Sequence, residues 1–105
     1  MELTIDTVET QRMQLVKVKG DVDLYTSTQM RAAVMKAIPK AGGAVGVDLS
    51  EVRYMDSSGV ATLIEGLRAA AKRKTEFVLV APSKPVMKVL GLARLDTIFT
   101  IRDAP

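Results

Sequence analysis

The chain contains no cysteine, no histidine and no tryptophan, and only two Tyr and two Phe among 105 residues. Without cysteine it forms no disulfide, no thiolate zinc site and no cysteine nucleophile. Without histidine it lacks the usual general base of serine hydrolases, the commonest metal ligand and the usual pH switch near neutrality. These absences argue against an enzyme, and we expect no cofactor and no metal centre.

The chain also lacks long hydrophobic runs. No stretch approaches the roughly 20 apolar residues that a transmembrane helix requires. Met1 is followed directly by an alternating stretch over 2–6, with neither the basic segment nor the apolar segment of a secretory signal. We therefore expect a cytoplasmic protein without membrane insertion.

The charge is only slightly unbalanced, with 15 Lys and Arg against 12 Asp and Glu, for a net charge of +3. The only basic run, 72–74, lies where a helix should end, and cations there complement the helix dipole. Contact with nucleic acid or an anionic membrane is the alternative interpretation of this run. A nucleic-acid binder is expected to carry stacking aromatics, and the four here are scattered. We therefore expect no direct nucleic-acid contact.

Hydrophobic periodicity predicts alternating strands and helices. Alternation predicts strands over 3–8 and 13–19, with Gly20 ending the second. From Met30, the apolar residues at 33, 34, 37 and 38 follow helical spacing and predict a helix. Thr26 with Gln29 has the pattern of a capping box at the start of this helix. The remaining elements are predicted in this order: a strand over 45–49, a connection over 48–54, a helix over 57–74, a strand over 77–81, a short helix from Ser83 to Gly91 and a last strand over 98–101.

This order, β-β-α-β-α-β-α-β, predicts one α/β domain over residues 1–105, with a mixed sheet of four or five strands and about three main helices. The two opening strands form a hairpin, and helices connect the later, parallel strands. One hypothesis is that all three helices pack on one face of the sheet, which leaves part of the other face for solvent or a partner.

The segment 54–60 places two hydroxyls, those of Ser57 and Ser58, at the start of a helix, where the first backbone N–H groups have no partner. One interpretation is structural: a serine caps the helix, with Asp56 as a competitor. The other is a phosphoserine site. A phosphate adds roughly −1.5 to −2 charges near those N–H groups and beside Asp56. A partner docked over the helix start would be released by the like-charge penalty.

Three stretches of the chain share a pattern with a known family. They are Gly-Asp-Val-Asp at 20–23 with Thr26 after it, Val-Asp-Leu-Ser at 47–50, and Met-Asp-Ser-Ser-Gly at 55–59. Together they resemble the STAS domain of bacterial anti-sigma factor antagonists over nearly the whole chain, and the last is the most specific. The resemblance implies a STAS-like fold.

The resemblance also implies a function, a phosphorylation-controlled switch between protein partners. The unphosphorylated form would bind an anti-sigma factor that is also a serine kinase, and so free a sigma factor. The kinase would phosphorylate Ser57, with Ser58 as the alternative position, and a metal-dependent serine phosphatase would reverse this. The positions that the resemblance assigns to partner binding are Asp23, Thr26, Asp56, Ser58 and Gly59.

Two other classes of function compete with this one. Some stand-alone STAS proteins resemble regulatory subunits that brace the ATPase of an ABC-type lipid transporter, but a serine at position 57 favours the antagonist class. An enzyme or nucleotide-binding protein is the third class, and the chain has no Gly-rich phosphate loop. Asp21 and Asp23 could face the same way and hold Mg²⁺, yet two ligands without a third make a weak site.

Overall fold

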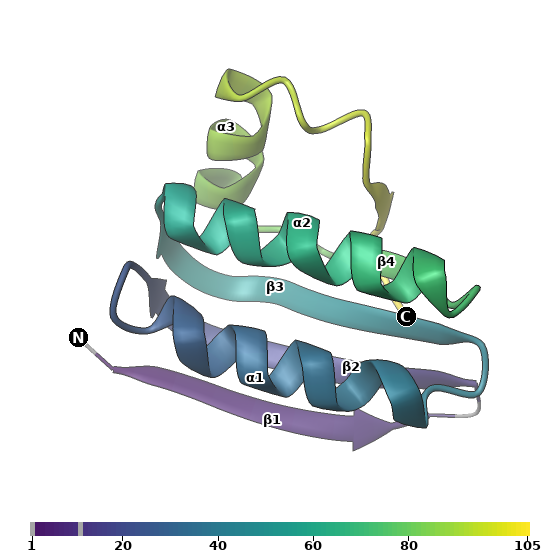
Figure 1. Cartoon of the computed structure of the whole chain (residues 1–105). Helices are drawn as coiled ribbons and strands as arrows, with labels where there is room; N and C mark the ends of the chain where they lie inside the picture. Colours follow the sequence, from purple (N-terminus) through teal and green to yellow (C-terminus); the bar gives the residue numbers. More distant parts are fainter. Residues whose placement is uncertain (1, 11) are drawn as a thin grey trace.

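Five strands form one mixed sheet in the order β1-β2-β3-β4-β5 (Figure 1). The structure is a computed structural model that describes residues 2–10 and 12–105. β1 pairs antiparallel with β2, and each later pairing is parallel. The strands are β1 (Leu3–Glu9), β2 (Met13–Val22), β3 (Ala44–Met55), β4 (Glu76–Val80) and β5 (Thr100–Arg102). The predicted fold class is confirmed, with five strands rather than four.

Helices make the crossovers that parallel neighbours require. They are α1 (Ser27–Ala37), followed by the 3₁₀ turn η1 (Ile38–Lys40), α2 (Ser57–Lys72) and α3 (Lys84–Leu92). Each buries one apolar stripe, and the buried side chains of all three join one core cluster with Val16, Val47 and Leu79 of the sheet. The shared core agrees with the hypothesis that the helices pack on one face of the sheet. The opposite face is not left open over the central strands, because Leu15, Val78 and Val80 are buried there. None of the described helices is long and apolar enough to span a bilayer.

The opposite face of the sheet carries a second, smaller core. Side chains alternate between the two faces of a strand, and Leu15, Val78 and Val80 belong to a cluster separate from that of their neighbours Val16 and Leu79. The central strands are thus apolar on both faces. This explains the continuous apolar run of β4, because a strand covered on both faces gains from apolar side chains in both directions.

The structure corrects two strand boundaries. β2 does not end at Gly20 but continues to Val22, and the register with β3 shifts between Gly20 and Asp21. Gly20 adopts φ +118°, a conformation that side-chain-bearing residues rarely adopt, so the glycine permits the irregularity instead of stopping the strand. The predicted connection 48–54 is also wrong, because β3 continues to Met55 alongside the extended β2.

The helix ends also differ from the predictions, and α2 ends at Lys72 instead of residue 74. The Thr26–Gln29 capping box is not formed, because the Thr26 side chain makes no cap hydrogen bond to α1. Gly91 does not stop α3, which continues to Leu92, and the left-handed residue after the helix is Arg94 at φ 58°. The last strand begins at Thr100 instead of residue 98.

Candidate functional site

Two strand-to-helix turns lie side by side at one end of the sheet. β2 and β3 are parallel neighbours, so the turn into α1 and the turn into α2 leave the sheet from the same end (Figure 1). Val22 pairs with Met55, and the Asp56 N–H donates to the Val22 carbonyl at 3.1 Å. The fold thereby brings together the two segments in which the sequence analysis placed its candidate residues.

Asp23 and Thr26 hold the first turn together. Asp23 Oδ1 accepts hydrogen bonds from the backbone N–H of Tyr25 at 2.8 Å and of Thr26 at 2.9 Å. Thr26 Oγ1 accepts from the Asp23 N–H at 2.9 Å and donates to the Asp21 carbonyl at 2.7 Å. The buried Thr26 hydroxyl is therefore used within the turn, which explains why it does not cap α1.

This hydrogen bonding also stabilises the charged form of Asp23. The backbone N–H of Thr26 makes the largest contribution, and that of Tyr25 acts in the same direction, so the pKa of Asp23 is lowered from its usual value. A carboxylate that accepts several N–H bonds is harder to protonate.

Asp56 caps α2. Its backbone is extended, and its Oδ1 accepts from the Ser58 N–H at 2.9 Å and from the Ser58 hydroxyl. Its carbonyl accepts from the N–H groups of Gly59 at 3.1 Å and Val60 at 3.2 Å. Of the two capping candidates left open by the sequence, the aspartate is the cap, and neither serine is.

The two serines consequently differ in availability. Ser57 is the first residue of α2, is exposed, and its hydroxyl makes no hydrogen bond to any residue that the structure describes. Ser58 is half-buried, and its hydroxyl is bound to the Asp56 carboxylate. An enzyme that approaches from solvent therefore reaches the Ser57 oxygen without breaking an internal contact.

Gly59 lets α2 approach the strand ends. A Cβ at this position would lie 2.6 Å from Met55 Cγ and 2.8 Å from Val22 Cγ1, closer than side chains tolerate. Gly59 and Thr26 are both buried. Neither residue therefore lies on the surface of these turns.

Asp21 and Asp23 do not share a site. Asp21 is buried, and the guanidinium of Arg53 lies 3.5 Å from its Oδ2, which accepts no hydrogen bond from a described residue. Asp23 binds the backbone of its own turn instead. Across residues 2–10 and 12–105, no three acidic side chains gather as ligands of a metal ion would.

The sequence analysis missed three exposed apolar side chains around these turns. Leu24 is 67%, Tyr25 83% and Tyr54 51% exposed. Leu24 and Tyr25 follow Asp23 in the first turn, and Tyr54 pairs with Asp21 on the neighbouring strand. The available signal was an apolar pair within an acidic turn, which a solvated loop does not require. A contiguous apolar patch rimmed by polar residues marks a surface that binds another protein, whereas single exposed apolar side chains are normal.

Comparison with known proteins identifies relatives of the whole domain. The family described as "Mlab, STAS domain" matches residues 5–102. An anti-sigma-B factor antagonist of Listeria monocytogenes is 29% identical over 86 residues, which cover 82% of this chain and 75% of that protein.

Solved structures share the fold at lower sequence identity. An anti-sigma factor antagonist from Mycobacterium paratuberculosis superposes with a TM-score of 0.87 at 22% identity, covering 98% of this chain and 87% of that one. The anti-sigma factor antagonist SpoIIAA in its unphosphorylated form gives 0.77 at 22% identity, covering 93% of this chain and 87% of that one. The phosphorylated form of SpoIIAA from Bacillus gives 0.72 at 22% identity, covering 93% and 90%.

Proposed function

The chain belongs to the STAS domain family, and from this membership and the geometry of the turn into α2 we propose that it is an anti-sigma factor antagonist switched by phosphorylation of Ser57. In this role it is a non-enzymatic regulator that works by binding. The unphosphorylated form binds an anti-sigma factor that is also a serine kinase, and a sigma factor is released. A metal-dependent serine phosphatase restores the binding form.

The observation that carries the proposal is the unequal state of the two hydroxyls. Ser57 Oγ is exposed and free of hydrogen bonds to described residues, whereas Ser58 Oγ is bound to the Asp56 carboxylate. Because Asp56 already caps the helix, a phosphate on Ser57 projects to solvent and requires no rearrangement of the cap. The fold thus accepts the modification, and its effect falls on whatever is docked there.

The switch is electrostatic. Phosphorylation adds roughly −1.5 to −2 charges at the residue next to Asp56. The turn that contains Asp23 lies beside this one at the same end of the sheet. A partner that covers these turns must then desolvate three negative groups together, and like charges placed at an interface cost several kcal/mol. The partner is released without any change in the backbone of this protein.

Three exposed side chains are proposed to bind the partner, and the charge of the phosphate opposes this binding. Leu24 and Tyr25 follow Asp23 in the first turn, Tyr54 lies two residues before Asp56 on β3, and tyrosine is among the residues that contribute most to binding at protein interfaces. We define Asp23, Leu24, Tyr25, Tyr54 and Ser57 as the docking surface. Its acidic and aromatic character fits a partner with basic side chains around an apolar patch.

The relatives support this assignment. The Listeria monocytogenes protein is named an anti-sigma-B factor antagonist, and SpoIIAA, which shares the fold, has been solved in both unphosphorylated and phosphorylated forms. The proposal transfers that modification to Ser57, the serine that here follows the capping aspartate.

The test is a pull-down from the native cell extract with three baits: the unmodified protein, Ser57→Asp and Ser57→Asn, with captured proteins identified by mass spectrometry. Asparagine matches aspartate in size but lacks its charge, so it separates electrostatics from shape. We expect an anti-sigma-type serine kinase on the unmodified and Ser57→Asn baits and its loss from Ser57→Asp.

Two results contradict the proposal. Equal capture of the kinase by all three baits would show that charge at Ser57 does not control binding. Capture of an ABC ATPase by all three baits, without any kinase, would assign the protein to the transporter subunits that the sequence analysis left as the alternative.

A further inference from the structure

The free edge of β1 is unusually open. Among the described residues β1 pairs only with β2, so alternate N–H and C=O groups along Leu3–Glu9 point away from the sheet without a strand partner. Its register with β2 is regular from Leu3 to Glu9, without a bulge. Proteins usually protect such an edge with lysine, proline, a bulge or a short strand. β1 contains no lysine or proline, its charged side chains are Asp6 and Glu9, and at seven residues it is longer than β5, the three-residue strand at the other edge.

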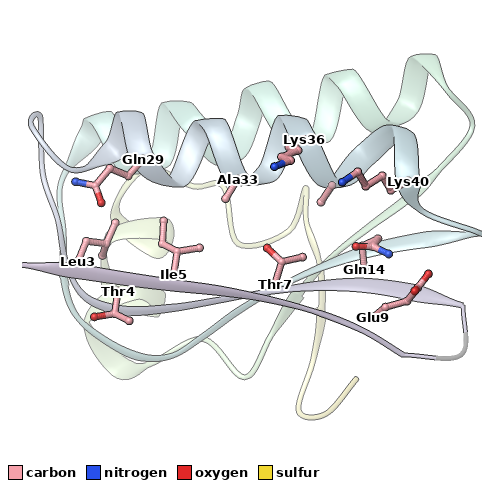
Figure 2. A pocket seen from close by; sticks show the side chains of 11 residues that line it. Leu3, Thr4, Ile5, Thr7, Glu9, Gln14, Gln29, Ala33, Lys36 and Lys40 are labelled. Carbon is pink, nitrogen blue, oxygen red and sulfur yellow. The ribbon is translucent and has the colours of Figure 1, made fainter.

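A groove of about 890 Å³ runs along this edge, between β1 and α1. Figure 2 shows Leu3, Ile5 and Thr7 of β1 pointing towards α1. Ala33 and Ala37 of α1 line the groove from the other side. The floor is therefore apolar over the first half of β1, and small side chains on α1 leave it unfilled.

The second half of the groove is basic. Lys36 and Lys40 stand over the end of β1 near Thr7 and Gln14 (Figure 2). Both lysines are exposed, and neither forms an ion pair with a residue that the structure describes. Glu9 is the one carboxylate among the groove residues, so two positive charges face one negative charge.

We propose that this edge and groove, independently of Ser57, form a docking site for an extended acidic segment of a partner protein, which adds to the sheet as a sixth strand beside β1. The segment's backbone would satisfy the free N–H and C=O groups of the edge. On its helix-facing side it would carry apolar residues beside Leu3 and Ile5 and carboxylates beside Lys36 and Lys40.

A small molecule would not satisfy a row of backbone groups along seven residues, so the edge favours a polypeptide. A second copy of this chain would offer these lysines no carboxylate. If two β1 strands paired antiparallel about their middle, Lys36 and Lys40 of each copy, which stand over the end of β1, would lie beside Leu3 and Ile5 of the other copy.

The experiment uses two blocked nine-residue probes, Thr-Glu-Thr-Glu-Thr-Val-Thr-Val-Thr and the same residues in reverse order, for antiparallel and parallel addition. Each is titrated to millimolar concentration into the ¹⁵N-labelled protein. We expect amide shift changes confined to 3–9 and 33–40, and slower hydrogen exchange at alternate amides of β1. Control peptides with lysine in place of both glutamates should bind at least fivefold more weakly.

A charge reversal provides the matched variant. Lys36→Glu combined with Lys40→Glu alters only exposed side chains, so the amide spectrum should keep its dispersion, and the preference between the acidic and basic peptides should invert. Equal affinity for both peptides, no change along β1 at millimolar peptide, or shifts without slower exchange of β1 amides would overturn the proposal. A free protein that sediments as a dimer with β1 amides already protected would overturn it in favour of a second copy.

Discussion

Asp56 and Ser57 are adjacent in the chain but contribute differently to stability. The Asp56 carboxylate accepts hydrogen bonds from the Ser58 N–H and hydroxyl, whereas the Ser57 hydroxyl makes no hydrogen bond to a described residue. Asp56→Ala should therefore lower the free energy of unfolding by about 0.5–2 kcal/mol, as the loss of a helix cap does. Ser57→Ala should change it by less than about 0.5 kcal/mol, as for an exposed residue without contacts. Urea denaturation measures both, and a larger loss from Ser57→Ala would mean that the serine is the cap.

Asp23 makes the protein sensitive to acid. Its pKa is lowered in the folded state by the backbone N–H of Thr26 and then of Tyr25, so the carboxylate stabilises the fold at pH values above its unfolded pKa of about 4. That contribution is lost as the pH falls through the lowered folded pKa. Asp23→Asn, which still offers an acceptor oxygen, should show a shallower loss of stability as the pH falls below about 4. Identical slopes in denaturation at several pH values would contradict this account.

The residue scale is also where the sequence was least informative. The pattern at 55–59 placed two serines and an aspartate at a helix start. The pattern does not say which of these side chains caps the helix, because that depends on the backbone conformation at the helix start. Only the extended backbone of Asp56 decides which side chain turns inward. The predicted capping box at Thr26 was wrong for a similar reason. The Thr26 hydroxyl donates to the Asp21 carbonyl and does not cap α1.

At the scale of elements, α2 carries a glycine that helix propensity opposes. A Cβ on Gly66 would lie 2.8 Å from Phe77 Cζ and 3.0 Å from Val34 Cγ1, and both of these side chains are buried. Alanine would gain about 1 kcal/mol of helix propensity, but overpacking a core costs about 1–3 kcal/mol. Gly66→Ala should therefore destabilise the protein by up to about 2 kcal/mol, measured by thermal or urea unfolding.

Gly91 supplies the matched control for this prediction. It lies inside α3, and a Cβ there would meet no atom within 4 Å. Gly91→Ala should keep the propensity gain and stabilise the protein by up to about 1 kcal/mol. If both substitutions changed stability in the same direction, packing of α2 against β4 would not be the reason for Gly66.

Element types were predictable because each has a clear period. Hydrophobic periodicity predicted a helix over 57–74 and a strand over 77–81, and α2 and β4 lie there to within two residues. The ends of β2 and β3 were not predictable, since each continues only because the other is beside it. The pairing of Gly20 with Val52 and of Val22 with Met55 is a contact between distant segments, and local patterns do not contain it.

At the scale of the whole molecule, the proposed docking surface depends on the parallel pairing of β2 and β3. This pairing places the turn at Asp23 and the turn at Asp56 at one end of the sheet, joined by the hydrogen bond from Asp56 to Val22. The order of elements predicted parallel strands joined by helices, which the structure confirms for β2 and β3. It did not predict that Tyr25 and Tyr54 are exposed, because exposure depends on how the turns fold.

Tyr25 should be the strongest apolar contact of that surface. It is the most exposed of the large hydrophobic side chains, at 83%, and its backbone is held by Asp23. Tyr25→Ala should weaken binding of the captured partner at least tenfold, because truncating a central interface tyrosine commonly costs about 2 kcal/mol or more. Ile98→Ala, an exposed apolar residue outside both turns, serves as the control in the same titration calorimetry. Equal effects of the two variants would place the interface elsewhere.

The central claim is that a phosphate on Ser57 releases a partner without altering the fold. The most direct measurement compares the affinity of the captured kinase for two forms of this protein, one unmodified and one carrying phosphoserine at position 57, with amide spectra of both. The account predicts at least tenfold weaker binding of the phosphorylated form, and spectral changes limited to the turn into α2. Unchanged affinity, or weaker binding accompanied by spectral changes throughout the sheet, would contradict it.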